Sequence, residues 1–503
     1  MPRSAVIAIT VLGVAALLLS TTFALVRSAQ LASSRTQIAA LRSELAAARP
    51  DTPDGDGAGG ATEPANPLDD LLEGGEGGGL EDLFPEDGGG LGGLLGTDVE
   101  QLARCIQQAG PPGSDDVPDG GASEQIAQIS DTVQELRSLS FDQEPSPEFL
   151  DDARITQRLT DEVRDEYDEG DADADVRMLA ALGAVPPDLD LIELQTELLT
   201  AQVAGFYDPD TGELVVRGDA SDDGLDPAAQ TTLAHELEHA LADQAFDLPI
   251  DVTEDVTDGD AALAALSVVE GDATLTQQQF TVVGLTIAEQ LGLNTDPDAL
   301  DAQRQLADVP HYVVQSLQFP YLAGLRFACA QYLDGGWEAV DAVYDALPTT
   351  TAEILDPRRY GTAAVDPRDP GRLGGDWERR RTTTLGAADL LWLFEAPGNE
   401  TTRALDAPHE QALAWTGGEL ALWVDGRDTA VGVALTQEAD GPLCDAVATW
   451  YERAFTAATD APTRRGERMV RESAAQTAVL TCEGADVRLG IGPDVVTARA
   501  LVR

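Results

Sequence analysis

Two histidines one helical turn apart are the residues of this chain best suited to chemistry. The chain has only four His in 503 residues, and two of them belong to the segment His235-Glu236-Leu237-Glu238-His239. On a helix, the i, i+4 spacing puts both imidazoles on one face, where they can bind a single metal ion. Glu236 projects beside that face and can act as a base towards water. We interpret the segment as part of a metal site; two surface histidines on an ordinary helix are the alternative.

A third ligand is required, because catalytic zinc takes three protein groups and keeps one position for water. Ala245 excludes the metzincin pattern, which needs another His at that fixed spacing. Glu270 is the first acid after nine uncharged residues that follow Asp260. An acid at the end of an apolar helical run must find a partner, and Gly271 beside it permits close approach of two helices. We therefore expect Glu270 to be the third ligand; a surface Glu is the alternative.

A helix and a hairpin must position these groups. Asp226-Pro227 predicts the start of the motif helix, with Asp as the N-cap and Pro at the first helical position. Residues 205–216 form two short apolar runs around a Pro/Gly turn, which predicts a β-hairpin. We expect its edge to lie beside the active-site cleft and to bind a substrate through main-chain pairing, with Phe206 and Tyr207 in contact with the substrate. An ordinary surface hairpin is the alternative.

Other side chains are candidates for supporting roles. Asp243 and Asp272 could each accept the N–H of a ligand imidazole and so fix its tautomer, or they could be surface acids. A hydroxyl that stabilises the developing oxyanion is also needed, and Tyr321 is the preferred candidate. The other candidates are Tyr207, Tyr312 and His311.

The remaining pattern predicts an α+β protein. Residues 123–400 read as a mainly helical domain with a small β-hairpin, and residues 401–503 as a small α+β module. Helices are expected at 99–108, 123–139, 146–167, 191–203, 261–292, 298–308, 310–346 and 444–455, and C-terminal strands at 420–424, 429–435, 478–482 and 486–491.

The N-terminal region differs in composition from the rest. Residues 5–26 are uncharged, which predicts a signal anchor or transmembrane helix over 1–27, with a cleavable signal peptide as the alternative. Residues 28–50 read as a helical stalk that could self-associate. Residues 51–122 read as an acidic Gly/Pro-rich linker, because 51–121 hold 17 acids and one Arg.

Charge and cysteine content narrow the function further. The net charge of −59, with no Lys, would repel phosphate backbones, so nucleic-acid binding is excluded. Four cysteines without a CxxC motif favour two disulfides in an exported protein. The expected pairs are Cys444 with Cys482 and Cys105 with Cys329; four reduced thiols in a cytosolic protein are the alternative.

The segments around the motif resemble the gluzincin superfamily of zinc metallopeptidases, and more closely a group of bacterial HExxH proteins that are membrane-anchored or exported. The shared segments are GFYDPDTGELVV, HELEHALADQAFDL, VVEGDATL, FPYLAGLRF, GGWEAVDAVY and PTTTAEILDPRRY, all between about residues 180 and 360. The resemblance implies a zincin-like domain that binds Zn²⁺ through His235, His239 and Glu270, with Glu236 catalytic.

It also implies a peptide or protein substrate and a body on the extracytoplasmic side of a membrane, or secreted if the N-terminal segment is cleaved. Glu238 departs from the strict motif, which prefers an uncharged residue at that position. A cell-surface binding or scaffold protein that keeps the metallopeptidase fold without turnover is therefore the alternative function.

Overall fold

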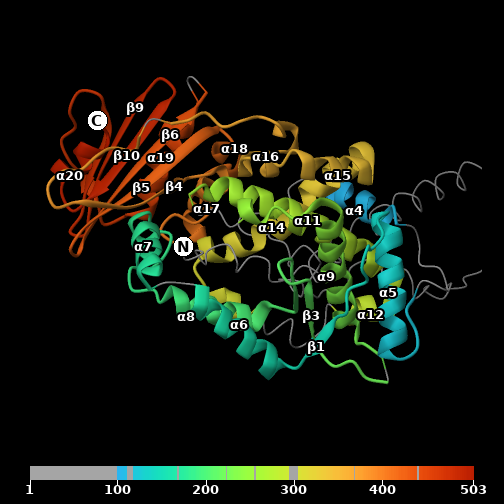
Figure 1. The fold of residues 1–503 in the computed structure, drawn as a ribbon. Coiled ribbons are helices and arrows are strands. Elements are labelled where there is room, and N and C mark those ends of the chain that lie inside the picture. Colours follow the sequence, from blue (N-terminus) through green and yellow to red (C-terminus); the bar gives the residue numbers. More distant parts are fainter. Residues whose placement is uncertain are drawn as a thin grey trace, which may run out of the picture.

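The computed structural model describes residues 99–109, 117–166, 169–222, 224–253, 257–293, 304–367, 369–438 and 441–503 (Figure 1). The expected anchor, the stalk and most of the linker fall in residues 1–98, outside the described residues, as do residues 298–303 of one expected helix. Within the described ranges, no helix is both long enough and apolar enough to cross a membrane.

The described residues combine helices and sheets, in agreement with the expected α+β class. The helices of the body are α4 (Val99–Gln107), α5 (Ala122–Arg137), α6 (Asp152–Glu166), α7 (Glu169–Ala181), α8 (Leu191–Gln202), α9 (Pro227–Phe246), α10 (Ile250–Thr253), α11 (Gly259–Gly284), α12 (Ile287–Leu293), α14 (His311–Gly335), α15 (Trp337–Asp345), α16 (Thr351–Leu355) and α17 (Ala387–Glu395). The body also has short 3₁₀ helices at η4 (Leu306–Asp308), η5 (Pro357–Arg359) and η6 (Thr401–Arg403).

Three expected helices have different bounds. The region 261–292 contains two helices, α11 and α12, and the region 310–346 is divided into α14 and α15 at Gly336. Gly336 has φ +70°, a left-handed conformation that suits glycine and interrupts the helix. The helix expected from residue 146 is preceded by a strand, β1 (Glu148–Leu150).

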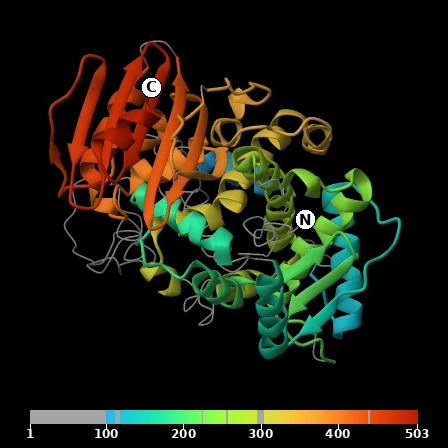
Figure 2. The ribbon, with the colours of Figure 1, turned by 60° about the vertical axis from the view of Figure 1, so that its left-hand side comes forward.

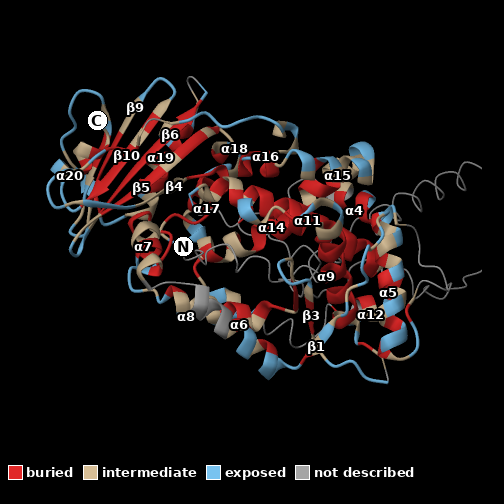
Figure 3. Cartoon of the chain, in the orientation of Figure 1, coloured by how far each residue is buried: buried red, intermediate tan, exposed pale blue. Residues whose placement is uncertain are grey.

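Helices α9, α11 and α14 form the buried centre of the body (Figure 3). The backbones of α11 and α14 touch, because a Cβ added at Gly271 would lie 2.4 Å from the carbonyl carbon of Gly324. A Cβ at Gly324 would lie 2.2 Å from the carbonyl oxygen of Ser267. Gly271 therefore permits the close helix approach expected from the sequence, and the partner is α14.

A three-stranded sheet lies beside the motif helix. Its order is β1-β3-β2, with β2 (Gly205–Asp208) antiparallel to β3 (Glu213–Arg217) and β1 parallel to β3. The two strands of the expected hairpin are therefore present, and β2 lies at the edge of the sheet.

The C-terminal region forms a seven-stranded antiparallel sheet at the opposite end of the molecule from the three-stranded sheet (Figure 2). Its order is β4 (Glu378–Thr384), β5 (Trp415–Asp425), β6 (Asp428–Gln437), β10 (Asp486–Gly492), β9 (Thr477–Glu483), β8 (Glu467–Glu472) and β7 (Thr459–Asp460). Strand β4 precedes residue 400, so the sheet starts before the boundary expected from the sequence.

Helices cover both faces of this sheet. Side chains along each strand point alternately to the two faces, and both faces carry apolar residues that pack against helices. Leu420 and Leu422 of β5 join the core that includes α17 and α19 (Leu443–Ala454), whereas Ala421 and Trp423 pack with α20 (Val495–Leu501). The remaining helix of the module is α18 (Pro408–Ala412).

Both predicted disulfides are present. Cys105 in α4 is bonded to Cys329 in α14, with a Cα–Cα distance of 5.8 Å. Cys444 in α19 is bonded to Cys482 in β9, with a Cα–Cα distance of 6.2 Å. The first disulfide fastens α4, which also packs against α11 and α14, to the body, and the second joins a helix to the sheet within the C-terminal module.

Candidate metal centre

The motif helix α9 begins where the sequence predicts. The Asp226 side chain accepts a hydrogen bond of 2.8 Å from the backbone N–H of Ala229, and Pro227 occupies the first turn. Every residue from 229 to 242 is buried, so the helix is surrounded by protein on all sides along this stretch. The two motif histidines therefore lie inside the protein.

The ring nitrogens of His235 and His239 meet the carboxylate of Glu270 from α11. The two Nε2 atoms are 3.1 Å apart, and Glu270 Oε2 lies 3.3 Å from His235 Nε2 and 3.6 Å from His239 Nε2. All three side chains are at most 1% exposed. Glu270, predicted from the end of an apolar run, thus faces both histidines across the contact between α9 and α11.

These separations suit a zinc ion. Zinc bonds of about 2.0–2.1 Å in a tetrahedral arrangement put neighbouring ligand atoms roughly 3.3–3.4 Å apart. The three observed distances lie on either side of this value. Both Glu270 oxygens lack a well-aligned hydrogen-bond partner among the described residues. The donor set therefore fits a cation at its centre.

The electrostatics of the cluster also favour a cation. Burial disfavours a charged imidazole and lowers the pKa of His235. Burial acts in the same direction on His239, but the carboxylates of Glu270, Glu236 and Glu238 outweigh it and raise its pKa to about 9. Burial would raise the pKa of Glu270, yet its contacts with the two imidazoles lower it, so Glu270 keeps its negative charge.

Glu236 is the fourth member of the constellation. It is fully buried, and neither of its carboxylate oxygens has a hydrogen-bond partner among the described residues. Burial raises its pKa to about 8. The first residue of β2, Gly205, lies so close that an added Cβ would be 3.1 Å from Glu236 Oε1. Strand β2 therefore begins directly against this carboxylate.

Sequence reasoning did not anticipate the group next to Glu238, which is Arg137 at the end of α5. The Arg137 Nε atom lies 3.5 Å from Glu238 Oε1, and its guanidinium makes two hydrogen bonds of 2.9 Å to the carboxylate of Asp272. Arg137 Nη2 also lies 2.7 Å from Asp341 Oδ1. The side chains of Arg137, Glu238 and Asp272 are completely buried.

This arginine joins the two helices that supply the candidate metal ligands. Glu238 adjoins His239 in α9, and Asp272 lies two residues after Glu270 in α11. The guanidinium carbon also lies 4.5 Å from the centroid of the Trp337 ring, which adds a cation–π contact to these ion pairs. Burial opposes the charge of Arg137, but Asp272 and Glu238 outweigh it and raise its pKa. The acidic residue in the motif therefore has an internal cation as its partner.

The other predicted residues have defined partners. The Tyr207 hydroxyl donates a hydrogen bond of 2.7 Å to Asp243, which links β2 to the motif helix. Phe206 is buried, with the guanidinium of Arg158 lying 5.6 Å from its ring centroid. Asp272 accepts from Arg137 and from the hydroxyl of Tyr344, at 3.1 Å for the latter.

Of the tyrosines on α14, Tyr321 is the one beside the centre. Its buried ring lies 6.3 Å from the His235 ring, centroid to centroid. At the start of the same helix, Tyr312 donates a hydrogen bond to Asp389, and His311 Nε2 lies 3.0 Å from Glu395 Oε2. The geometry therefore keeps Tyr321 as the candidate for contact with a reacting group.

No family model matches the chain, and comparison with curated proteins and with solved structures gives no significant match. Interpretation of the site therefore depends on its own geometry and chemistry.

Proposed function

We propose that this protein is a zinc-dependent peptide hydrolase. The observation that carries the proposal is the meeting of His235, His239 and Glu270 within 3.1–3.6 Å, beside the unpartnered carboxylate of Glu236. Two imidazoles and a carboxylate are a ligand set of catalytic zinc sites, and a neighbouring Glu supplies the base.

The roles of the side chains follow from their chemistry. His235, His239 and Glu270 would hold Zn²⁺, which lowers the pKa of water towards about 7 and polarises a carbonyl group. Glu236 would take the proton of the attacking water and deliver it to the leaving amine nitrogen. Tyr321 is the candidate donor to the carbonyl oxygen, because its ring lies beside that of His235.

Export is part of the proposal. Disulfides persist in oxidising compartments, and all four cysteines are paired. We therefore propose that the body lies on the extracytoplasmic side of the membrane, anchored by residues 1–27, with peptides or proteins as substrates.

A second candidate function is a cell-surface binding or scaffold protein that holds a metal without turnover. The observation that favours it is the burial of all four side chains, His235, Glu236, His239 and Glu270, each at most 1% exposed. A structural metal site is closed in this way, whereas a catalytic site must admit its substrate.

Metal analysis combined with peptide hydrolysis separates these functions. We expect the purified protein to hold one zinc per chain and to cleave peptides, and Glu236→Gln to keep the zinc while losing hydrolysis. Glu270→Ala should lose most of the zinc, whereas the control His311→Ala, altered at the far end of α14, should retain both properties. A wild-type protein that binds no zinc would overturn the proposal, and zinc without hydrolysis of any peptide would favour the scaffold.

A further inference from the structure

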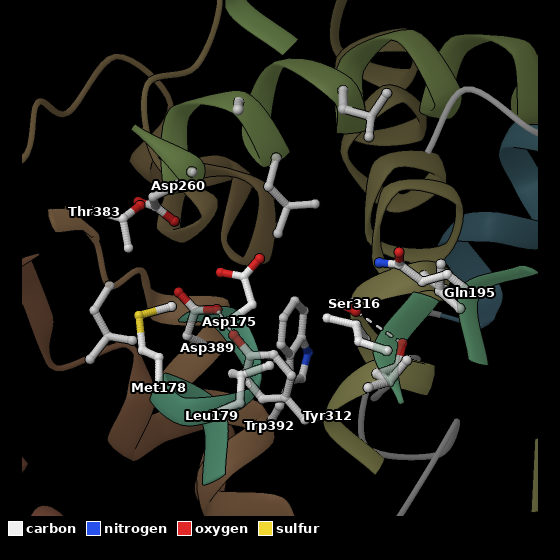
Figure 4. Close-up of a pocket in the computed structure, with 18 of the residues that line it drawn as sticks. Asp175, Met178, Leu179, Gln195, Asp260, Tyr312, Ser316, Thr383, Asp389 and Trp392 are labelled. Carbon is white, nitrogen blue, oxygen red and sulfur yellow. Dashed lines mark hydrogen bonds between the residues drawn. The ribbon is translucent and has the colours of Figure 1, made fainter. Parts of the chain in front are cut away.

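A cavity of about 270 Å³ lies between the helical body and the C-terminal module (Figure 4). We propose that it binds a large apolar side chain of the peptide substrate. This inference rests on the proposed hydrolase function.

The wall of the cavity comes near the candidate metal centre at three places, and the residues of the centre itself do not line the cavity. Tyr321, in its wall, has its ring 6.3 Å from the His235 ring. Leu266, also in the wall, lies one helical turn before Glu270 on α11. Val203 lies two residues before Gly205, the residue in close contact with Glu236. A side chain held in the cavity would therefore belong to a residue close to the cleaved bond.

The wall contains charged residues, but each of them has a hydrogen-bond or ion-pair partner. Asp260 accepts a hydrogen bond of 3.1 Å from the backbone N–H of Thr351, and Asp175 forms an ion pair with Arg381. Figure 4 shows the carboxylates of Asp175, Asp260 and Asp389 on one side of the cavity and Gln195 on the other.

Asp389 is also satisfied, because it accepts hydrogen bonds from the Tyr312 hydroxyl and from the backbone N–H of Gly386. Much of the remaining wall is apolar, with leucines from α8, α11 and α14. A charged ligand would find no free countercharge here, whereas an apolar group would lose only water.

Two polar atoms in the wall, Gln195 Oε1 and Trp392 Nε1, lack a hydrogen-bond partner among the described residues. The Oε1 atom of Gln195 can accept an N–H, the group that a peptide backbone offers beside each side chain. The N–H of Trp392 is a donor that a peptide carbonyl can satisfy. An apolar side chain with the main-chain N–H and C=O beside it can therefore satisfy both atoms, whereas an ionised fatty acid offers an acceptor for Trp392 but no donor for Gln195.

The C-terminal module supplies one side of the cavity. Leu420 comes from β5, and Thr383 and Thr384 come from β4, the edge strand of the seven-stranded sheet. Trp392 of α17, in the core shared with that sheet, forms another part of the wall. The volume exceeds that of an engineered apolar cavity of about 150 Å³ that binds benzene, so a phenyl or indole group fits.

Peptides that differ at one residue beside the cleaved bond test the proposal. With Gly, Leu, Phe or Trp placed in turn on each side of that bond, we expect kcat/KM to rise by about tenfold or more from Gly to Phe on one side. Leu179→Trp and, independently, Met178→Trp should fill the cavity and reduce that ratio to about threefold or less. The control Ile287→Trp, at an exposed position on α12, should keep the ratio.

Direct binding separates this proposal from the hydrolase function. In Glu236→Gln, calorimetry should show binding of N-acetylphenylalaninamide and little binding of N-acetylglycinamide, with the preference lost in Glu236→Gln/Leu179→Trp. If wild type cleaves peptides without an apolar preference, or both Trp variants keep that preference, the cavity proposal is wrong while the function stands. If no peptide is cleaved, the proposed hydrolase function is wrong, and the calorimetry alone then tests whether the cavity binds an apolar side chain. Binding of laurate but not of either amide would also overturn the cavity proposal.

Discussion

The guanidinium of Arg137 and the carboxylate of Glu238 lie 3.5 Å apart, and neither side chain is exposed to solvent. Glu238 is the residue that departs from the usual zinc-peptidase motif, and Arg137 makes this departure tolerable. Burial, followed by the nearby Asp272, raises the pKa of Glu238 well above its ordinary value, and the arginine acts against this shift. The motif helix therefore carries a buried carboxylate that depends on another helix for its partner.

Replacing Arg137 with Met should lower the free energy of unfolding by about 3–5 kcal/mol, because it leaves buried carboxylates without a countercharge. Arg154→Met is the matched control: Arg154 pairs with Glu148 at 3.2 Å on the surface, and its loss should cost at most about 1 kcal/mol. Urea unfolding measures both. Equal losses in the two variants would show that the buried network contributes no more than a surface pair.

Gly271→Ala should destabilise the protein by about 1–3 kcal/mol, because the new methyl group would press α11 away from Gly324 in α14. Since Gly271 adjoins Glu270, the same change should weaken zinc binding. In Gly292→Ala the new methyl group meets nothing within 4 Å, and the variant should be about as stable as wild type or up to about 1 kcal/mol more stable. Thermal unfolding and a competitive zinc titration test both statements; unchanged zinc affinity in Gly271→Ala would contradict the second.

Zinc should stabilise the fold through the three proposed ligands. A ligand present at 100 times its dissociation constant adds about 2.7 kcal/mol to the free energy of unfolding, provided that it binds only the folded state. We expect this increase in wild type and in His311→Ala, and its loss in His239→Ala. Unfolding with and without a chelator provides the measurement, and an equal zinc effect in His239→Ala would exclude His239 as a ligand.

Asp260 should make stability fall as the pH rises. Burial, assisted by Asp389 and Asp258, raises its pKa to about 7 in the folded protein, although the hydrogen bonds from Thr351 act against this shift. A carboxyl with a raised folded pKa contributes stability that is complete below its unfolded pKa of about 3.9 and is lost as the pH rises through about 7. Relative to Asp260→Asn, wild type should lose up to about 1.4 kcal/mol per pH unit over this window. Parallel stability curves for the two proteins between pH 4 and 8 would refute the assignment.

The parts of the site that could be predicted depend on local signals. Asp226-Pro227 marks the start of α9, the histidine spacing puts two rings on one face, and Glu270 is distinguished by the apolar run before it. The hairpin and the disulfides were predicted for similar reasons, from turn residues and from the small number of possible cysteine pairs.

Partners that meet only in the tertiary structure could not be predicted in this way. Arg137 is one of 31 arginines, and nothing near it in sequence indicates that it faces Glu238. Asp243 was a candidate partner for a ligand imidazole, with a surface acid as the alternative. It accepts a hydrogen bond from Tyr207, across a contact that depends on how β2 packs on α9. Strand β4 was missed because its sequence, ERRRTTT, does not alternate apolar and polar residues. An edge strand can have such a sequence when its positions are exposed or half-buried, as they are here.

The disulfide between Cys105 and Cys329 determines how the body is connected to the part of the chain that contains α4. Helix α4 is joined to α14 by this bond and packs against α11 and α14, so a pull applied from the N-terminal side of α4 would reach the body through the bond and through this packing. A single proteolytic cut between residues 109 and 122 would not release the body, because the two pieces would stay covalently joined. Release would require reduction of the disulfide or a cut on the N-terminal side of α4.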